Sequence, residues 1–274
     1  MSDIDILVEF LHRHEIIAVL SGAGCSTASG IPDYRDEYGN WKNARPVQYG
    51  DFVNNCSVRK HYWARSYAGW SRVSSARPNA AHLALADLER SGHVMSLITQ
   101  NVDNLHRKAG SRRVVDLHGV LQKIRCLHCS LKGQRSDWQA RLEDCNPHWN
   151  PGISCYAADG DAALSTSDCM DFKVPDCPRC GGVIKPDVVF FGEPVPSETV
   201  TAASRVLEQS DALLVVGSSL MVFSGYRFVR LAEDRRIPVA IINRGRTRAD
   251  AIADHKLSSD CTDILPRLVD ELAA

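Results

Sequence analysis

The 274-residue sequence predicts an α/β fold, a Rossmann-like doubly wound parallel sheet with a smaller inserted zinc-binding module and a helical lobe. Short apolar runs typical of buried strands alternate along the chain with helical stretches, as in parallel sheets covered by helices on both faces. Glycines follow the first of these runs, at the position where such sheets bind nucleotides. Two Cys-x-x-Cys pairs interrupt the alternation and are typical of a zinc site.

The first element is an amphipathic helix, because Ile4, Leu7, Val8 and Leu11 recur at helical spacing. The apolar run 16–20 comes next and predicts a buried strand. The same two patterns recur to the end of the chain. They predict further strands at 93–99, 114–117, 183–191, 212–216 and 238–242, and helices at 80–90, 196–209 and 225–235.

Two stretches depart from this alternation. Residues 35–77 are weakly periodic and rich in Tyr and Trp, which predicts a mobile loop followed by a small helical lobe. Residues 126–182 are rich in Cys, Asp, Pro and Gly, which predicts an inserted zinc module. We therefore expect one domain over 1–274. Its Rossmann-like part is expected at about 1–34, 78–120 and 183–274, the loop and lobe at about 35–77, and the zinc module at about 121–182.

The overall charge is nearly balanced, since 32 Lys and Arg face 33 Asp and Glu. Without a global basic field, the sequence predicts neither a nucleic-acid nor a membrane partner. Residues 1–14 show no cationic apolar leader, which favours the cytoplasm. Six cysteines outside the two pairs are expected to be thiols, as in a reducing compartment. They are Cys25, Cys56, Cys145, Cys155, Cys169 and Cys261.

The two cysteine pairs are Cys126 with Cys129 and Cys177 with Cys180. Two thiolates on one tight turn can bind one side of a tetrahedral Zn²⁺, and a second such turn completes a four-sulfur shell with no open position. The alternatives are two disulfides or four ordinary buried cysteines. Turn-forming, polar flanks favour zinc, and a closed shell predicts a single structural ion.

Polar clusters follow four of the predicted strands. Because the carboxyl ends of parallel strands meet in one crevice, these clusters are expected to converge on a ligand. The first cluster, at a strand end with two glycines, can hold a pyrophosphate, although alone it is also compatible with a plain turn. The clusters contain Gly22, Ala23, Gly24, Ser26 and Thr27; Gln100, Asn101, Val102 and Asp103; Gly217, Ser218 and Ser219; and Asn243, Arg244 and Gly245.

His118 follows the predicted strand 114–117, so its imidazole is expected at the same crevice. An imidazole with a pKa near 6.5 can take a proton at neutral pH, which makes His118 the candidate general base. The other nine histidines lack such a setting. The apolar segment 185–193 is either an ordinary core strand or an edge that accepts an extended peptide as an added strand.

Together these motifs resemble those of the sirtuins, in family order and over nearly the whole chain. The segment 218–228, Tyr34 and the spacer that contains 146–149 are most similar to the class II branch, which includes the mitochondrial lipoamidase-type sirtuin. The matching motifs are GAGCSTASGIPDYR at 22–35, TQNVDNLH at 99–106, HG at 118–119, the two cysteine pairs, PDVVFFGE at 186–193 and GSSL at 217–220.

The resemblance implies NAD-dependent removal of acyl groups from protein lysines, which yields nicotinamide, free lysine and O-acyl-ADP-ribose. It implies that NAD is a co-substrate, that one zinc is structural, and that the partners are acylated lysine side chains. His118 and Asn101 would be catalytic. The phosphates would be held by Gly22, Ala23, Gly24, Ser26 and Thr27, and a loop that closes over NAD would contain Asp33, Tyr34 and Arg35. The nicotinamide side would be bound by Gln100, Asn101, Val102 and Asp103. The adenosine side would be bound by Gly217, Ser218, Ser219, Asn243, Arg244, Gly245 and Cys261.

The peptide and its acyl group would contact Val188, Val189, Phe190, Gly192, Glu193, Val222 and Phe223. Desuccinylase-type sirtuins carry a Tyr-x-x-Arg pair, but here Trp41 stands three residues after Tyr38. A neutral acyl group is therefore expected, unless Lys42 or Arg45 reaches the channel. The alternatives in other classes are a protein mono-ADP-ribosyltransferase that uses the same NAD site, and a non-catalytic zinc-dependent interaction module.

Overall fold

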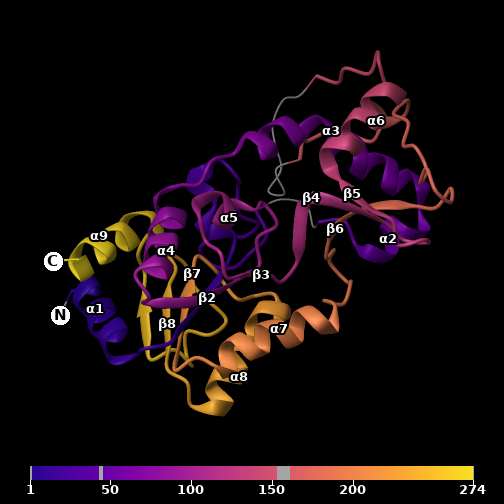
Figure 1. Cartoon of the computed structure of the whole chain (residues 1–274). Helices are drawn as coiled ribbons and strands as arrows, with labels where there is room; N and C mark the ends of the chain where they lie inside the picture. The colour runs from indigo at the N-terminus through magenta and orange to yellow at the C-terminus, as the bar shows by residue number, and fades with distance from the viewer. Residues whose placement is uncertain (1, 43–45, 153–160, 274) are drawn as a thin grey trace.

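The computed structural model describes residues 2–42, 46–152 and 161–273, so Arg45 and Cys155 lie outside the described residues. It confirms the predicted fold class (Figure 1). A six-stranded parallel sheet has the strand order β3-β2-β1-β7-β8-β9. Its strands are β1 (Ile17–Ser21), β2 (Val94–Thr99), β3 (Val114–Asp116), β7 (Ala212–Val216), β8 (Val239–Ile242) and β9 (His255–Leu257).

Helices cover both faces of this sheet (Figure 1). On β1, Ile17 and Val19 join the core of one face while Ala18 and Leu20 join the other, because successive side chains of a strand point to opposite faces. One face packs against α1 (Asp3–Arg13), α4 (Ala80–Arg90) and α9 (Cys261–Ala273). The other packs against α7 (Ser197–Glu208) and α8 (Phe223–Arg235).

A second, smaller unit carries its own core. Its three-stranded sheet has the order β5-β4-β6 and consists of β4 (Gly119–Cys126), β5 (Lys132–Gln134) and β6 (Ile184–Val188). Trp63 on α3 and Trp138 on α6 meet at its centre, with ring centroids 5.5 Å apart. The helices of this unit are α2 (Tyr49–Asn54), α3 (Cys56–Ser75) and α6 (Arg135–Cys145), and the short α5 (Leu105–Ala109) follows β2.

One expectation was wrong. The run 183–191 was expected among the strands of the parallel sheet, but β6 pairs antiparallel with β4 in the small sheet. An apolar run predicts a buried strand without specifying its partner. The strands β4, β5 and β9 were not predicted, because each contains polar or charged residues and none is an apolar run.

The chain reverses its strand order between β1 and β7, which are neighbours in the sheet. Ligands of doubly wound sheets bind at such a point, outside the carboxyl ends of the strands. The first glycine loop follows β1 and the second follows β7, so both lie at this position. No helix in the described part of the chain is long and apolar enough to cross a membrane.

Candidate functional site

A large cavity of about 1090 Å³ opens at the carboxyl ends of β1, β2, β7 and β8 and reaches the loop after β6. All residues that the sequence predicted for catalysis, cofactor binding or substrate binding line this cavity. The structure therefore brings together segments that lie up to 239 residues apart, from Gly22 to Cys261. Their individual roles stay predictions.

The two glycine loops, 22–27 after β1 and 217–219 after β7, contact each other directly. The Gly24 amide donates a hydrogen bond to the Gly217 carbonyl at 2.8 Å. A Cβ atom on Gly24 would lie 2.9 Å from that oxygen, and one on Gly217, whose φ is +60°, would lie 2.4 Å from the Cys25 nitrogen. Side chains are thus excluded where backbone must approach a ligand, as a pyrophosphate cradle requires.

A buried network joins the ends of β1 and β2. The Ser26 hydroxyl donates to Asp103 Oδ2 at 2.7 Å and accepts from Asn101 Nδ2 at 3.1 Å. Asn101 Nδ2 also donates to the Gly22 carbonyl at 3.0 Å, and Asp103 Oδ1 accepts from the Leu105 amide at 2.8 Å. Burial raises the pKa of Asp103, and its hydrogen bonds oppose this. These contacts hold the Asn101 amide and the Asp103 carboxyl at the cavity wall.

His118 has a defined tautomer. Its Nδ1 lies 2.8 Å from the Gln100 carbonyl oxygen, which can only accept, so Nδ1 carries the hydrogen. Its Nε2 therefore presents a lone pair, which accepts from the Ser224 hydroxyl at 2.7 Å. Burial lowers the pKa of His118 below its ordinary value, while the bond to Gln100 opposes the shift. The ring is neutral at neutral pH, with Nε2 available as a base.

Sequence reasoning missed three side chains that support this site. Ser224, at the start of α8, contacts His118. His106 Nε2 lies 2.8 Å from the Ser21 hydroxyl, and His82 Nε2 lies 3.5 Å from the Ser26 hydroxyl. Neither His82 nor His106 lines the cavity, so the expectation that His118 alone among the histidines has a catalytic setting stays a prediction. His106 lies in the motif 99–106 and Ser224 in the segment 218–228, but neither segment indicates these contacts, because the partners lie in different parts of the chain.

The buried pair His82 and His106 predicts acid sensitivity. Burial lowers the pKa of His82 to about 4 and that of His106 to about 3, against an ordinary value of 6.5. Below pH 6.5 the unfolded chain binds more protons than the folded chain, so the free energy of unfolding falls as pH decreases toward those values. Between pH 7 and pH 5 we expect a loss on the order of 2–4 kcal/mol, measured by denaturant unfolding.

A variant pair separates this effect from general acid denaturation. His106→Gln should lose less stability between pH 7 and pH 5 than the unmodified chain does. The control His12→Gln removes an exposed histidine and should retain the full loss. Equal losses in all three proteins would show that the buried pair does not cause the acid sensitivity.

Aromatic side chains form the wall between the loop at 33–42 and the loop after β6. The Trp41 and Phe191 ring centroids lie 5.5 Å apart, and those of Tyr34 and Phe191 lie 6.2 Å apart. The Arg35 guanidinium stacks over Trp41 at 4.0 Å. Lys42 pairs with Asp33 at 2.5 Å, so its charge is compensated within the loop.

The opposite end of the cavity is formed by the loop after β8. Asn243 Nδ2 donates to the Gly245 carbonyl at 2.9 Å, and Arg244 forms an ion pair with Asp260. A Cβ atom on Gly245 would lie 2.6 Å from Glu37 Cα, so a glycine lets the 33–42 loop dock here. Cys261, the first residue of α9, lines the cavity beside this loop.

The four paired cysteines converge in the smaller unit. All four Sγ atoms lie within 4.8 Å of one another. The distances are 3.6 Å from Cys126 to Cys180 and 3.7 Å from Cys129 to Cys177. A tetrahedron with Zn–S bonds of ~2.3 Å has S–S edges of ~3.8 Å, so the cluster fits one zinc ion with a closed shell. The nine described cysteines are free thiols, which contradicts the disulfide alternative for these four.

Comparisons with known proteins agree with the geometry. The sequence pattern of the Sir2 family matches residues 22–224. The chain is 53% identical to a Bordetella bronchiseptica "NAD-dependent protein deacetylase", over 98% of both chains. It is 46% identical to the Drosophila melanogaster "NAD-dependent protein deacylase Sirt4", over 98% of this chain and 87% of that protein.

The fold is also similar to that of solved structures. A structure described as "Sir2-p53 peptide-NAD+" has a TM-score of 0.80 and 29% sequence identity, and the match covers 99% of each chain. One described as "Structural Basis for the Mechanism and Regulation of Sir2 Enzymes" has a TM-score of 0.78 and 33% identity, over 99% of this chain and 98% of the other.

Proposed function

This chain belongs to the Sir2 family, the sirtuins, and we propose that its cavity removes acyl groups from protein lysines in an NAD-dependent reaction with His118 as general base. The family membership and the deacetylase and deacylase relatives support the reaction. The observation that carries the assignment of His118 is its geometry. Gln100 fixes the proton on Nδ1, which leaves Nε2 as the basic nitrogen.

The volume and the lining of the cavity support NAD as its ligand. The close approach of Gly24 to Gly217 supports placing the pyrophosphate over the glycine loops, and Asn243, Arg244 and Cys261 would then contact the adenosine. Asn101 and Asp103 would hold the nicotinamide side. When bound, NAD supplies the ribose carbon that receives the acyl oxygen and the nicotinamide that leaves.

The protein's own residues would cover the bound substrates and accept a proton. The loop at 33–42 docks on the loop after β8, where the Glu37 backbone carbonyl accepts a hydrogen bond from the Arg246 amide at 2.8 Å. In this position it would cover bound NAD and exclude water. A substrate hydroxyl that displaced the Ser224 hydroxyl would lie within reach of His118 Nε2, which would take its proton. The zinc lies in the other unit and would hold structure only.

Mass spectrometry of acyl-lysine peptides incubated with the protein and NAD tests this function. We expect nicotinamide release that requires the acyl-lysine peptide, together with O-acyl-ADP-ribose. Release that does not require an acyl group, with ADP-ribose on a protein side chain, would instead support the mono-ADP-ribosyltransferase. No NAD binding at all would support the interaction module.

Two finer assignments are also proposals. The segment 218–228, Tyr34 and the spacer that contains 146–149 support the class II branch that includes the lipoamidase-type sirtuin, and the similarity to the Drosophila Sirt4 is compatible with it. The free thiols, which are typical of a reducing compartment, support a cytoplasmic location. The domain parts at about 1–34, 35–77, 78–120, 121–182 and 183–274 also remain predictions.

We expect neutral acyl groups to react faster than succinyl. The predicted walls Phe190, Phe191, Val222 and Phe223 all line the cavity. Burying a carboxylate there without a partner costs several kcal/mol, whereas each buried methylene contributes ~0.8 kcal/mol. A butyryl-lysine peptide should therefore exceed its succinyl counterpart by at least about tenfold in kcat/KM.

Arg227 provides the strictest test of this expectation. It lines the cavity, its guanidinium lies 5.3 Å from the Phe223 ring centroid, and its buried Nε has no hydrogen-bond partner among the described residues. Lys42 is paired with Asp33, whereas Arg227 retains a buried donor that could receive an acidic acyl group. Faster reaction of the succinyl peptide, together with loss of that difference in Arg227→Met, would contradict the neutral preference.

A further inference from the structure

A fully buried lysine lies directly beneath the loop that follows β6. The Lys185 side chain is 0% exposed, although lysine is almost never buried completely without a partner. It extends from the second residue of β6 toward the segment 188–193, which lines the cavity. The mechanism proposed above does not use this group.

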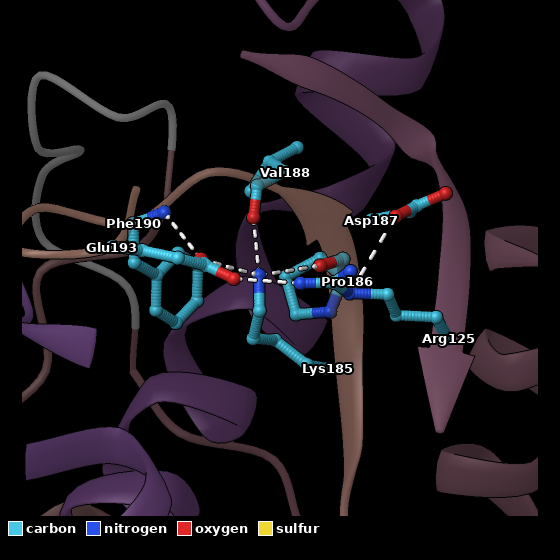
Figure 2. Close-up of polar contacts among 7 residues, drawn as sticks. All are labelled: Arg125, Lys185, Pro186, Asp187, Val188, Phe190 and Glu193. Carbon is cyan, nitrogen blue, oxygen red and sulfur yellow. Dashed lines mark hydrogen bonds and ion pairs between the residues drawn. The ribbon is translucent and has the colours of Figure 1, made fainter. Parts of the chain in front are cut away.

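The Lys185 ammonium is surrounded by oxygen atoms (Figure 2). It forms an ion pair with Glu193 Oε2 at 3.0 Å. It donates to the carbonyl oxygens of Pro186, at 3.2 Å, and Val188. It also lies 4.4 Å from the Phe190 ring centroid, where a cation interacts favourably with the π face.

Glu193 extends this contact to the neighbouring strand. Its Oε1 pairs with Arg125 Nη2 at 2.6 Å, and Arg125 on β4 lies opposite Lys185 in the sheet register. Arg125 Nε lies 3.7 Å from Asp187 Oδ1 (Figure 2). Two cations and two carboxylates thus balance one another, and the two that are buried, Lys185 and Glu193, pair directly.

The network fixes the backbone of the loop. Lys185 binds the Val188 carbonyl, and Glu193 Oε2 accepts from the Phe190 amide at 2.9 Å. The Glu193 amide closes the turn by donating to the Phe190 carbonyl at 3.0 Å. Between these points, the Val189 amide donates to the His118 carbonyl at 2.8 Å. The same loop is therefore tied to the backbone of the proposed base.

Two backbone groups of the loop 188–193 are available for hydrogen bonds. Among the described residues, the Val189 carbonyl and the Gly192 amide have no hydrogen-bond partner. An extended peptide that adds to a backbone edge uses such groups, and its affinity depends on how rigidly they are held. A flexible turn would have to be ordered each time a peptide binds, which would weaken binding.

We infer that Lys185 and Glu193 form a positioning pair that holds the loop 188–193 ready for the residues flanking the acylated lysine. The inference rests on the proposed deacylase function. It assigns Lys185 a role in peptide recognition, although no part of its side chain reaches solvent. It predicts that the pair matters for a peptide and much less for an isolated acyl-lysine, which has no flanking backbone.

The test compares two substrates, an acetyl-lysine peptide of about ten residues and N-acetyl-acetyl-lysine amide. The double variant Lys185→Met with Glu193→Gln removes both charges and leaves Arg125 with Asp187. We expect kcat/KM for the peptide to fall at least about tenfold more than that for the amide, with the change in the peptide KM. Glu193→Asp keeps all four charges but shortens the side chain. It should also lower kcat/KM for the peptide more than kcat/KM for the amide.

Arg107→Met is the matched control. Arg107 also holds a carboxylate, Asp116 at 3.0 Å, and a backbone carbonyl, Val114 at 2.7 Å, but neither it nor its partners line the cavity. In this variant, the ratio of kcat/KM for the peptide to kcat/KM for the amide should equal that of the unmodified chain. Equal losses on both substrates in the Lys185 and Glu193 variants, or no loss, would overturn the inference. If the unmodified chain deacetylates neither substrate, the proposed function fails instead.

Discussion

Replacing His118 with alanine is expected to lower kcat for deacylation by ~10²-fold or more. The reason is the loss of the Nε2 lone pair, since general-base catalysis typically contributes ~10²–10⁴. The measurement is kcat at saturating NAD and acetyl-lysine peptide, with the thermal midpoint as a check on folding. NAD binding should survive, because the glycine loops do not contact this ring.

His61→Ala is the matched control for this variant. His61 is also partly buried and also contacts a backbone carbonyl, that of Leu164 at 2.9 Å, but it does not line the cavity. It should keep nearly full activity. Full activity in His118→Ala would instead remove His118 from the mechanism and leave the cavity without its proposed base.

The pH profile offers a second readout on His118. Burial lowers the pKa of this ring, so a larger fraction of the folded protein carries neutral His118 at pH 6.5 than an exposed histidine would provide. Activity should therefore fall at a lower pH than it would with an unshifted histidine as the base. A profile that already falls between pH 8 and pH 7 would point to a different base.

Cys177→Ser is expected to release the zinc and to destabilise the whole smaller unit. A thiolate shell supplies folding free energy directly, with ~10–16 kcal/mol of zinc binding measured in small zinc domains. Loss of part of that energy should lower the thermal midpoint by roughly 10 °C or more. Metal analysis of the purified variant, alongside a thermal melt, measures both effects.

Cys169→Ser provides the comparison, because Cys169 is also buried in the core of the smaller unit but lies outside the four-sulfur cluster. It should retain one zinc per chain and melt close to the unmodified protein. One equivalent of zinc retained by Cys177→Ser would show that the four-cysteine ligand set is wrong.

The sequence by itself determined those features that depend on local spacing. The alternation of apolar runs and helical stretches was enough to predict the parallel sheet, because strand and helix periods are set by residues a few positions apart. Each cysteine pair was recognisable because two thiolates three residues apart already have zinc geometry. His118 and the glycine loops could be placed because the carboxyl ends of parallel strands share one edge.

Only the tertiary structure decided which distant segments meet. β6 pairs with β4, although its apolar sequence is compatible with either sheet. His82, His106 and Ser224 support the site solely through contacts with side chains far along the chain. Lys185 is a commonplace residue in the sequence, and its burial against Glu193 and Arg125 appears only in the fold. Covalent spacing governs local geometry, whereas long-range contacts depend on packing and on pairing of buried polar groups, which no short motif encodes.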